Sequence, residues 1–238
     1  MAAVLISETF ESGVLLQSQG GQWLDAPAAN IVTTEQVHAG TRALKYDPSF
    51  STTTGLYRTV TATQILYIDM YWFFPTNFQY GPNGAPGRHT LRASNFVGDN
   101  VFANYLDTGI KGTGGMWGVE WNWSGPDTHS YLDLFTFPQN QWSRLELLLT
   151  LNDVGQFNGS TKIWLNGVSV LDATGDQYRT NNTLFTLFAA TSNFDGPFTG
   201  DPHYWYLDDI TVWNDCPATG ASCSPTQTIT RCKSIRLY

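Results

Sequence analysis

The stretch from Trp142 to Val170 constrains the fold of this chain more than any other part of the sequence. It reads as a strand (142–150), a polar loop rich in Asn, Asp and Gly, a second strand (162–165), the pair Asn166-Gly167 and a third strand. An Asn-Gly pair between two such runs predicts a tight hairpin, because both residues accept the positive φ that the turn requires. Elsewhere short β-rich runs recur between Gly, Pro, Asn and Asp, while helical spacing of apolar residues is nearly absent. The sequence therefore predicts an all-β, two-sheet antiparallel sandwich.

Composition sets the size of the domain and excludes some partners. A chain of 238 residues with 42% hydrophobic residues can bury one sizeable core, so we expect one domain over 1–214. Residues 215–238, rich in Ser, Thr and Cys, are expected to form a tail or a linker stub. The formal net charge of −8 argues against nucleic acid and anionic membranes as partners. Without an apolar run of about 20 residues we expect no membrane insertion, and we expect a monomer.

The three cysteines all lie near the C-terminus. Cys216 and Cys223 enclose a short loop that predicts a disulfide, which would place the protein in an oxidising compartment. Cys232 is then left over. We therefore expect an extracellular or secreted protein whose leader is not present in this chain.

Several motifs together resemble the concanavalin A-like jelly-roll proteins, and most of all the alginate- and glucuronan-type polysaccharide lyases. Trp164-Leu165-Asn166-Gly167-Val168 and the run 204–213 resemble strands of that sandwich, and Phe10-Glu11-Ser12-Gly13 resembles its opening. The aromatic run 66–78 is followed by a Gly-rich loop and then by Arg88-His89-Thr90-Leu91-Arg92, as in those lyases. The resemblance implies a jelly roll that handles a polysaccharide or oligosaccharide.

Strand alternation gathers the candidate site residues onto one face. In each of the runs 88–92, 116–123 and 129–134, polar side chains alternate with apolar ones. If the three strands share one curved sheet, the polar face would collect Arg88, Arg92, Glu120, Asn122, His129, Tyr131 and Asp133.

That set suits β-elimination from a uronate-containing glycan. Arg92 and Asn122 would neutralise the substrate carboxylate, and Tyr131 or His129 would move protons. Arg88, Glu120, Asp133 and Tyr80 would bind substrate. Three alternatives stay open: a binding groove without chemistry, a solvated sheet face with structural ion pairs, and a hydrolase with Glu120 and Asp133 as paired carboxylates.

The aromatic residues permit two interpretations. Trp117, Trp121 and Trp123 alternate along one strand, which favours the core of the sandwich. An aromatic residue in a Gly- and Pro-rich loop, such as Tyr80 or Phe198, is a better platform for stacking on a sugar ring.

A structural calcium ion is a further expectation. Glu11 near the first strand and Asp208-Asp209 in the last resemble a calcium site of related sandwiches. Calcium prefers several oxygen ligands, and backbone carbonyls can complete the shell. Such a site would pin the two ends of the domain together.

Two functions therefore compete, with a structural or adhesive surface sandwich as a third alternative. The Arg, His and Tyr set favours a polysaccharide lyase. The absence of the Gly-Gly-Lys-containing lyase signature and the net charge of −8 favour a non-catalytic carbohydrate-binding module or lectin-like domain.

Overall fold

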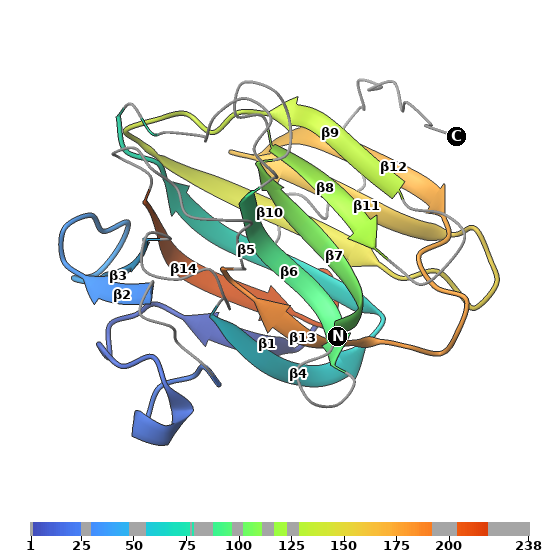
Figure 1. Ribbon diagram of the computed structural model, residues 1–238, viewed down its shortest axis with the longest axis horizontal. Helices are drawn as coiled ribbons and strands as arrows, with labels where there is room; N and C mark the ends of the chain where they lie inside the picture. The colour runs from blue at the N-terminus through green and yellow to red at the C-terminus, as the bar shows by residue number, and fades with distance from the viewer. Residues whose placement is uncertain are drawn as a thin grey trace.

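Two antiparallel sheets pack face to face in the computed structural model (Figure 1). The structure describes residues 2–24, 30–47, 56–76, 78, 88–96, 102–110, 117–122, 129–191 and 204–218. Between 88 and 133 it describes the backbone of these strands and, of their side chains, that of Tyr131. The predicted all-β jelly roll is confirmed, and the helical structure in the described residues is one 3-10 turn, Gln17–Gln19.

Fourteen strands make up the described part of the two sheets. They are β1 (Val4–Glu8), β2 (Asn30–Thr33), β3 (Ala43–Tyr46), β4 (Tyr57–Thr63), β5 (Ile65–Phe73), β6 (Arg88–Phe96), β7 (Phe102–Ile110), β8 (Trp117–Asn122), β9 (His129–Phe135), β10 (Trp142–Thr150), β11 (Gly159–Leu165), β12 (Val168–Asp176), β13 (Phe185–Ala189) and β14 (Trp205–Trp213). The eight-stranded sheet runs β12-β11-β10-β5-β14-β3-β2 with β1 beside β14, and the six-stranded sheet runs β4-β13-β6-β7-β8-β9.

The hydrophobic core lies between the two sheets. In β5 the side chains of Leu66, Ile68, Met70 and Trp72 are fully buried, because every second residue of a strand faces the same side. From the six-stranded sheet, Phe185 and Phe188 join the same cluster. The intervening residues of β5 and β10 face outward from the eight-stranded sheet. That alternation gives the sheet a second, more polar surface.

The hairpin expected from the sequence forms as predicted. Asn166 and Gly167 adopt φ of 51° and 77° between β11 and β12, as a tight turn requires. β10 pairs with β11 on one side and with β5 on the other, in unbroken register on both sides. The hairpin thereby continues the eight-stranded sheet to its β12 edge.

The first and last strands are neighbours. β1 pairs antiparallel with β14, from Val4 opposite Trp213 to Glu8 opposite Ile210. The Asn214 amide donates to the Ala3 carbonyl at 3.1 Å, which extends the pairing by one step. No helix in the described ranges is both long and apolar enough to span a membrane.

Candidate functional site

The strands that carry the predicted site lie side by side in the six-stranded sheet, in the order β6-β7-β8-β9 (Figure 1). The pairing of β13 with β6 shows which face of the sheet each position takes. Phe188 of β13 belongs to the core and lies opposite Ala93 of β6, so the row of Ala93 faces the core. Arg92 lies opposite Ala189, which places it one row away, on the outer face of the sheet. The register across β7 and β8 then assigns the remaining positions.

Two rows of outward positions cross the sheet. The first joins Arg92, Asp107, Glu120 and Ser130, and the second joins Ser94, Tyr105 and Asn122. Arg92, Glu120 and Asn122 therefore share one face, as the sequence predicted. Asp107 and Ser130 are additions that sequence reasoning missed, because their rows depend on pairing between strands distant in sequence.

The expectation that Tyr131, His129 and Arg88 share this face is wrong. His129 lies opposite Trp121, and Tyr131 lies opposite Val119, so both fall in rows that alternate with Glu120. Arg88 lies opposite Ile110, because a register shift between His89 and Leu91 reverses the alternation before Arg92. A further register shift, between Trp117 and Val119, leaves Asp133 without a register partner in β8. Tyr80 lies outside the described residues.

The side chain of Tyr131 bridges the two sheets. Its hydroxyl donates to Asp176 Oδ2 at 2.6 Å, and Asp176 is the last residue of β12 in the eight-stranded sheet. The Tyr178 hydroxyl donates to the same oxygen at 2.7 Å, and Asp176 is 9% exposed. Burial raises the pKa of Tyr178 well above its ordinary value. The Tyr131 side chain thus points inward, links β9 to β12 and is not part of the outer face.

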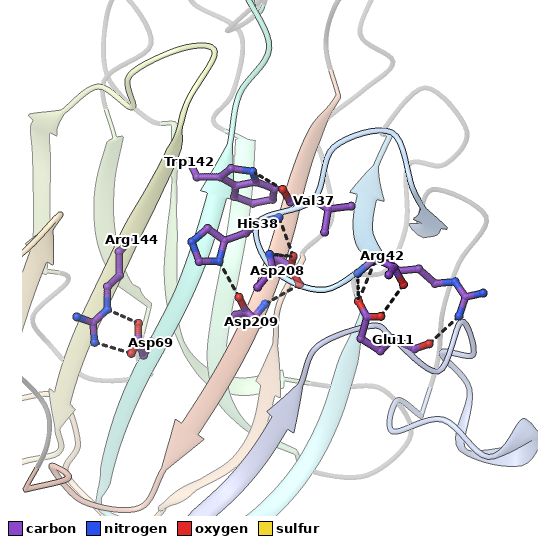
Figure 2. A network of polar contacts seen from close by, with 11 residues as sticks. Glu11, Val37, His38, Arg42, Asp69, Trp142, Arg144, Asp208 and Asp209 are labelled. Carbon is purple, nitrogen blue, oxygen red and sulfur yellow. Dashed lines mark hydrogen bonds and ion pairs between the residues drawn. The ribbon is translucent and has the colours of Figure 1, made fainter.

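The three residues expected to bind calcium surround one loop, 34–42 (Figure 2). Glu11 accepts hydrogen bonds from the Thr41 amide at 2.8 Å, the Thr41 hydroxyl at 2.7 Å and the Arg42 amide at 2.8 Å. These bonds hold the pKa of the Glu11 carboxyl below its ordinary value. Glu11 therefore fixes one end of the loop.

Asp208 and Asp209 fix the other end of the loop. Asp208 Oδ2 accepts the His38 and Ala39 amides at 3.0 and 3.3 Å, and burial raises the pKa of its carboxyl to about 6. Asp209 Oδ2 lies 2.7 Å from His38 Nδ1.

Amide and hydroxyl groups thus donate hydrogen bonds to these carboxylates, where a calcium ion would otherwise neutralise their charge. Among the described residues no three His, Cys, Asp or Glu side chains come together to hold a metal. The calcium site stays a prediction of the sequence, and the donors around these carboxylates do not favour it.

The C-terminal cysteines are described only in part. Cys216 is disulfide-bonded. Cys223 and Cys232 lie outside the described residues, so the pairing of Cys216 with Cys223 stays a prediction, as does the domain boundary at residue 214.

Comparisons with known proteins find one family model and several solved structures that resemble this chain. Residues 129–206 match the model of the family described as Polysaccharide lyase 14. No curated protein sequence matches the chain at a significant level.

Three solved structures illustrate the likeness in shape. The alginate lyase vAL-1 from Chlorella virus superposes with a TM-score of 0.62 and 16% identity, covering 88% of this chain and 99% of that one. The endo-β-1,4-glucuronan lyase from Trichoderma reesei gives 0.56 and 14%, covering 80% and 92%. The binding domain of Paraclostridial Mosquitocidal Protein 1 gives 0.57 and 10%, covering 89% of this chain and 48% of that one. The chain therefore has the concanavalin A-like jelly-roll fold that alginate and glucuronan lyases share.

Proposed function

We propose that the protein is an extracellular polysaccharide lyase that cleaves a uronate-containing glycan by β-elimination on the outer face of the six-stranded sheet. The observation that carries the proposal is the match of residues 129–206 to the Polysaccharide lyase 14 model, on a fold that alginate and glucuronan lyases share. The matched segment begins with β9, whose Ser130 is a position of the first outward row. The disulfide at Cys216 supports an oxidising, extracellular location.

The rows supply the residue types that β-elimination needs. Arg92 and Asn122 would bind the uronate carboxylate and stabilise the charge that develops when the C5 proton leaves. Tyr105, in register with Asn122, takes the role that Tyr131 cannot fill. Its phenol would exchange protons with the substrate. The C5 proton passes to the base, the C4–O bond breaks, a C4–C5 double bond forms, and the leaving oxygen is protonated.

The test is a screen for unsaturated uronate, followed by ultraviolet absorbance, on alginate, glucuronan, pectate and glycosaminoglycans. On the substrate that is cleaved, Tyr105→Phe should lower kcat by about 10²-fold, since it removes the proton-transferring oxygen and keeps the ring. Arg92→Ala should raise KM and lower kcat together. Tyr131→Phe is the matched control, and it should leave kcat near the wild-type value.

The competing function is a glycan-binding domain without chemistry. The observation that favours it is the comparable superposition of a domain described as a binding domain, at a TM-score of 0.57. If no acidic glycan yields unsaturated product while at least one is retained on an affinity column, the lyase proposal is rejected and the binding domain is favoured.

A further inference from the structure

A half-buried cluster lies on the outer face of the eight-stranded sheet, away from the proposed lyase site. The outer-face cluster consists of Asp69 and Tyr71 of β5, Trp142 and Arg144 of β10, and His38 of the loop 34–42. Arg144 lies opposite Tyr71 in the β5–β10 register, so the two side chains are neighbours on one face. Figure 2 shows His38 between Trp142 and the Arg144–Asp69 pair. Two strands and one loop thus converge on a single patch.

The aromatic part of the cluster is held rigidly. The His38 ring stacks on the Tyr71 ring with centroids 3.6 Å apart and an angle of 19° between the planes. Trp142 meets His38 edge-on at 5.6 Å, and its Nε1 donates to the Val37 carbonyl at 3.1 Å. Asp209, which holds His38 Nδ1, adopts a φ of 48°, a conformation that costs free energy in a residue other than glycine. Asp209 lies at the register shift between Asp208 and Thr211 in the β5–β14 pairing, and its carboxylate orients the His38 ring.

Polar atoms in the cluster are left without partners. Arg144 donates through Nε and Nη2 to Asp69 at 2.9 and 2.7 Å, and within the described residues its Nη1 has no acceptor. The Tyr71 hydroxyl and His38 Nε2 likewise have no hydrogen-bond partner in the described part of the chain. His38 Nδ1 lies 2.7 Å from Asp209 Oδ2, so Nε2 is the ring nitrogen left to contact a ligand. The patch offers donors and acceptors side by side.

The charges decide which ligand these groups fit. Four carboxylates lie in or beside the cluster, those of Asp69, Glu146, Asp208 and Asp209. Of the described residues that form ion pairs with these carboxylates, Arg144 is the one that is always charged. These carboxylates outnumber the one permanent cation, so the local field opposes an anion. Arg144 Nη1 is a donor, which a hydroxyl oxygen can accept and an ammonium group cannot. A neutral molecule with many hydroxyl groups avoids the repulsion and supplies both acceptors and donors.

We propose that the outer-face cluster is a second glycan site, one that takes a neutral sugar unit, distinct from the proposed uronate site on the opposite sheet. The sugar hydroxyls would accept from Arg144 Nη1 and Tyr71 and hydrogen-bond to His38 Nε2. The C–H face of the sugar ring would pack on the half-exposed aromatic rings. The site would let the protein hold a neutral glycan with one sheet while the other sheet faces an acidic one.

The experiment is calorimetric titration with cellohexaose, mannohexaose and xylohexaose, and with hexamers of alginate and chitosan as anionic and cationic probes. Amide chemical shifts locate the site. At least one neutral hexamer should bind with shifts at residues 38, 71 and 144. Tyr71→Phe, which keeps the stacked ring, should weaken that binding about 5-fold. Arg144→Lys, which keeps the charge and loses the planar fork, should weaken it further.

Lys162→Ala is the matched control, because Lys162 lies on the same sheet and pairs with Asp172 at 3.2 Å, outside the cluster. The proposal is overturned if no neutral hexamer binds, if a charged hexamer alone binds at the cluster, or if Tyr71→Phe and Arg144→Lys both bind a neutral hexamer like wild type. Neutral hexamers contain no uronate, so these outcomes are independent of lyase activity.

Discussion

Removing the hydroxyl of Tyr131 tests whether this residue has a structural or a catalytic role. It shares Asp176 Oδ2 with the Tyr178 hydroxyl, at 2.6 and 2.7 Å. Tyr131→Phe removes one of two phenol donors from a carboxylate that is 9% exposed. We expect the free energy of unfolding in urea to fall by about 1–3 kcal/mol, the usual result of removing one partner of a buried group. Lyase turnover should remain near wild type.

Tyr178→Phe serves as the companion variant, because it removes the other donor to the same oxygen and lies outside the six-stranded sheet. It should destabilise at least as much, because the Tyr178 hydroxyl also contacts Thr161 Oγ1 at 3.0 Å. A Tyr131→Phe protein of wild-type stability with turnover reduced about 10²-fold would contradict the structural role and restore Tyr131 as a proton-transferring residue.

Asp208 makes stability depend on pH. Its pKa in the folded protein is about 6, against an ordinary value of 3.8, with burial as the largest cause. The folded state therefore binds more protons than the unfolded state between those values, and this contribution to stability is lost as pH rises through them. The difference in unfolding free energy between wild type and Asp208→Asn should change by up to about 3 kcal/mol from about pH 4 to about pH 7, to the disadvantage of wild type.

Urea unfolding of both proteins across that pH range checks this sign. Comparing the pair matters because Glu11, whose pKa is lowered, contributes in the opposite direction in both proteins. Parallel curves for the two proteins would show that Asp208 titrates alike in the folded and unfolded states.

At the scale of elements, the loop 34–42 depends on a close approach at Gly40. A Cβ on Gly40 would lie 2.4 Å from Glu11 Oε1, and Gly40 has φ of 73°. Gly155 has φ of 74° with nothing within 4 Å of the same position. Gly155→Ala should therefore cost about 1 kcal/mol of unfolding free energy from backbone strain alone. Gly40→Ala should cost about 1–2 kcal/mol more, because the Glu11 carboxylate must leave the Thr41 and Arg42 amides.

Thermal or urea unfolding of the two alanine variants measures this difference directly. Equal losses would mean that the Glu11 side chain moves aside without cost, and that its bonds to the loop contribute little to stability.

Individual strands were predictable because their signals are local. The strand expected at 142–150 matches β10, and the Asn166-Gly167 turn matches the hairpin, since pattern and turn chemistry lie within a few residues. β2, only Asn30–Thr33, carries no such signal and was missed. Among the described strands it pairs with β3 alone, so its strand conformation comes from a partner and not from its own sequence.

Which residues share a face was less predictable from the sequence, because a register shift interrupts the alternation of side chains along a strand. The shift between His89 and Leu91 puts Arg88 and Arg92 in alternate rows, although both occupy even positions in the sequence. The register of β9 against β8 likewise separates Tyr131 from Glu120. Register depends on contacts between strands, which no single run of residues encodes.

At the scale of the whole molecule, the jelly roll followed from composition, turn residues and the lyase-like motifs together. The outer-face cluster did not follow from the sequence. His38 joins Tyr71 and Trp142 only because Asp208 and Asp209, about 170 residues away, hold the loop 34–42 against the sheet. Such a cluster arises from topology, and sequence alone left His38 without a role.

The pairing of β1 with β14 has a consequence for how such a domain is combined with others. Because Ala3 and Asn214 hydrogen-bond to each other, chain enters and leaves the sandwich at one point. A host protein could receive the sandwich within a surface loop by opening that loop about 5 Å, the spacing of two paired strands. The entry and exit of the sandwich are thus held about one strand spacing apart, whatever sequence is joined to either end.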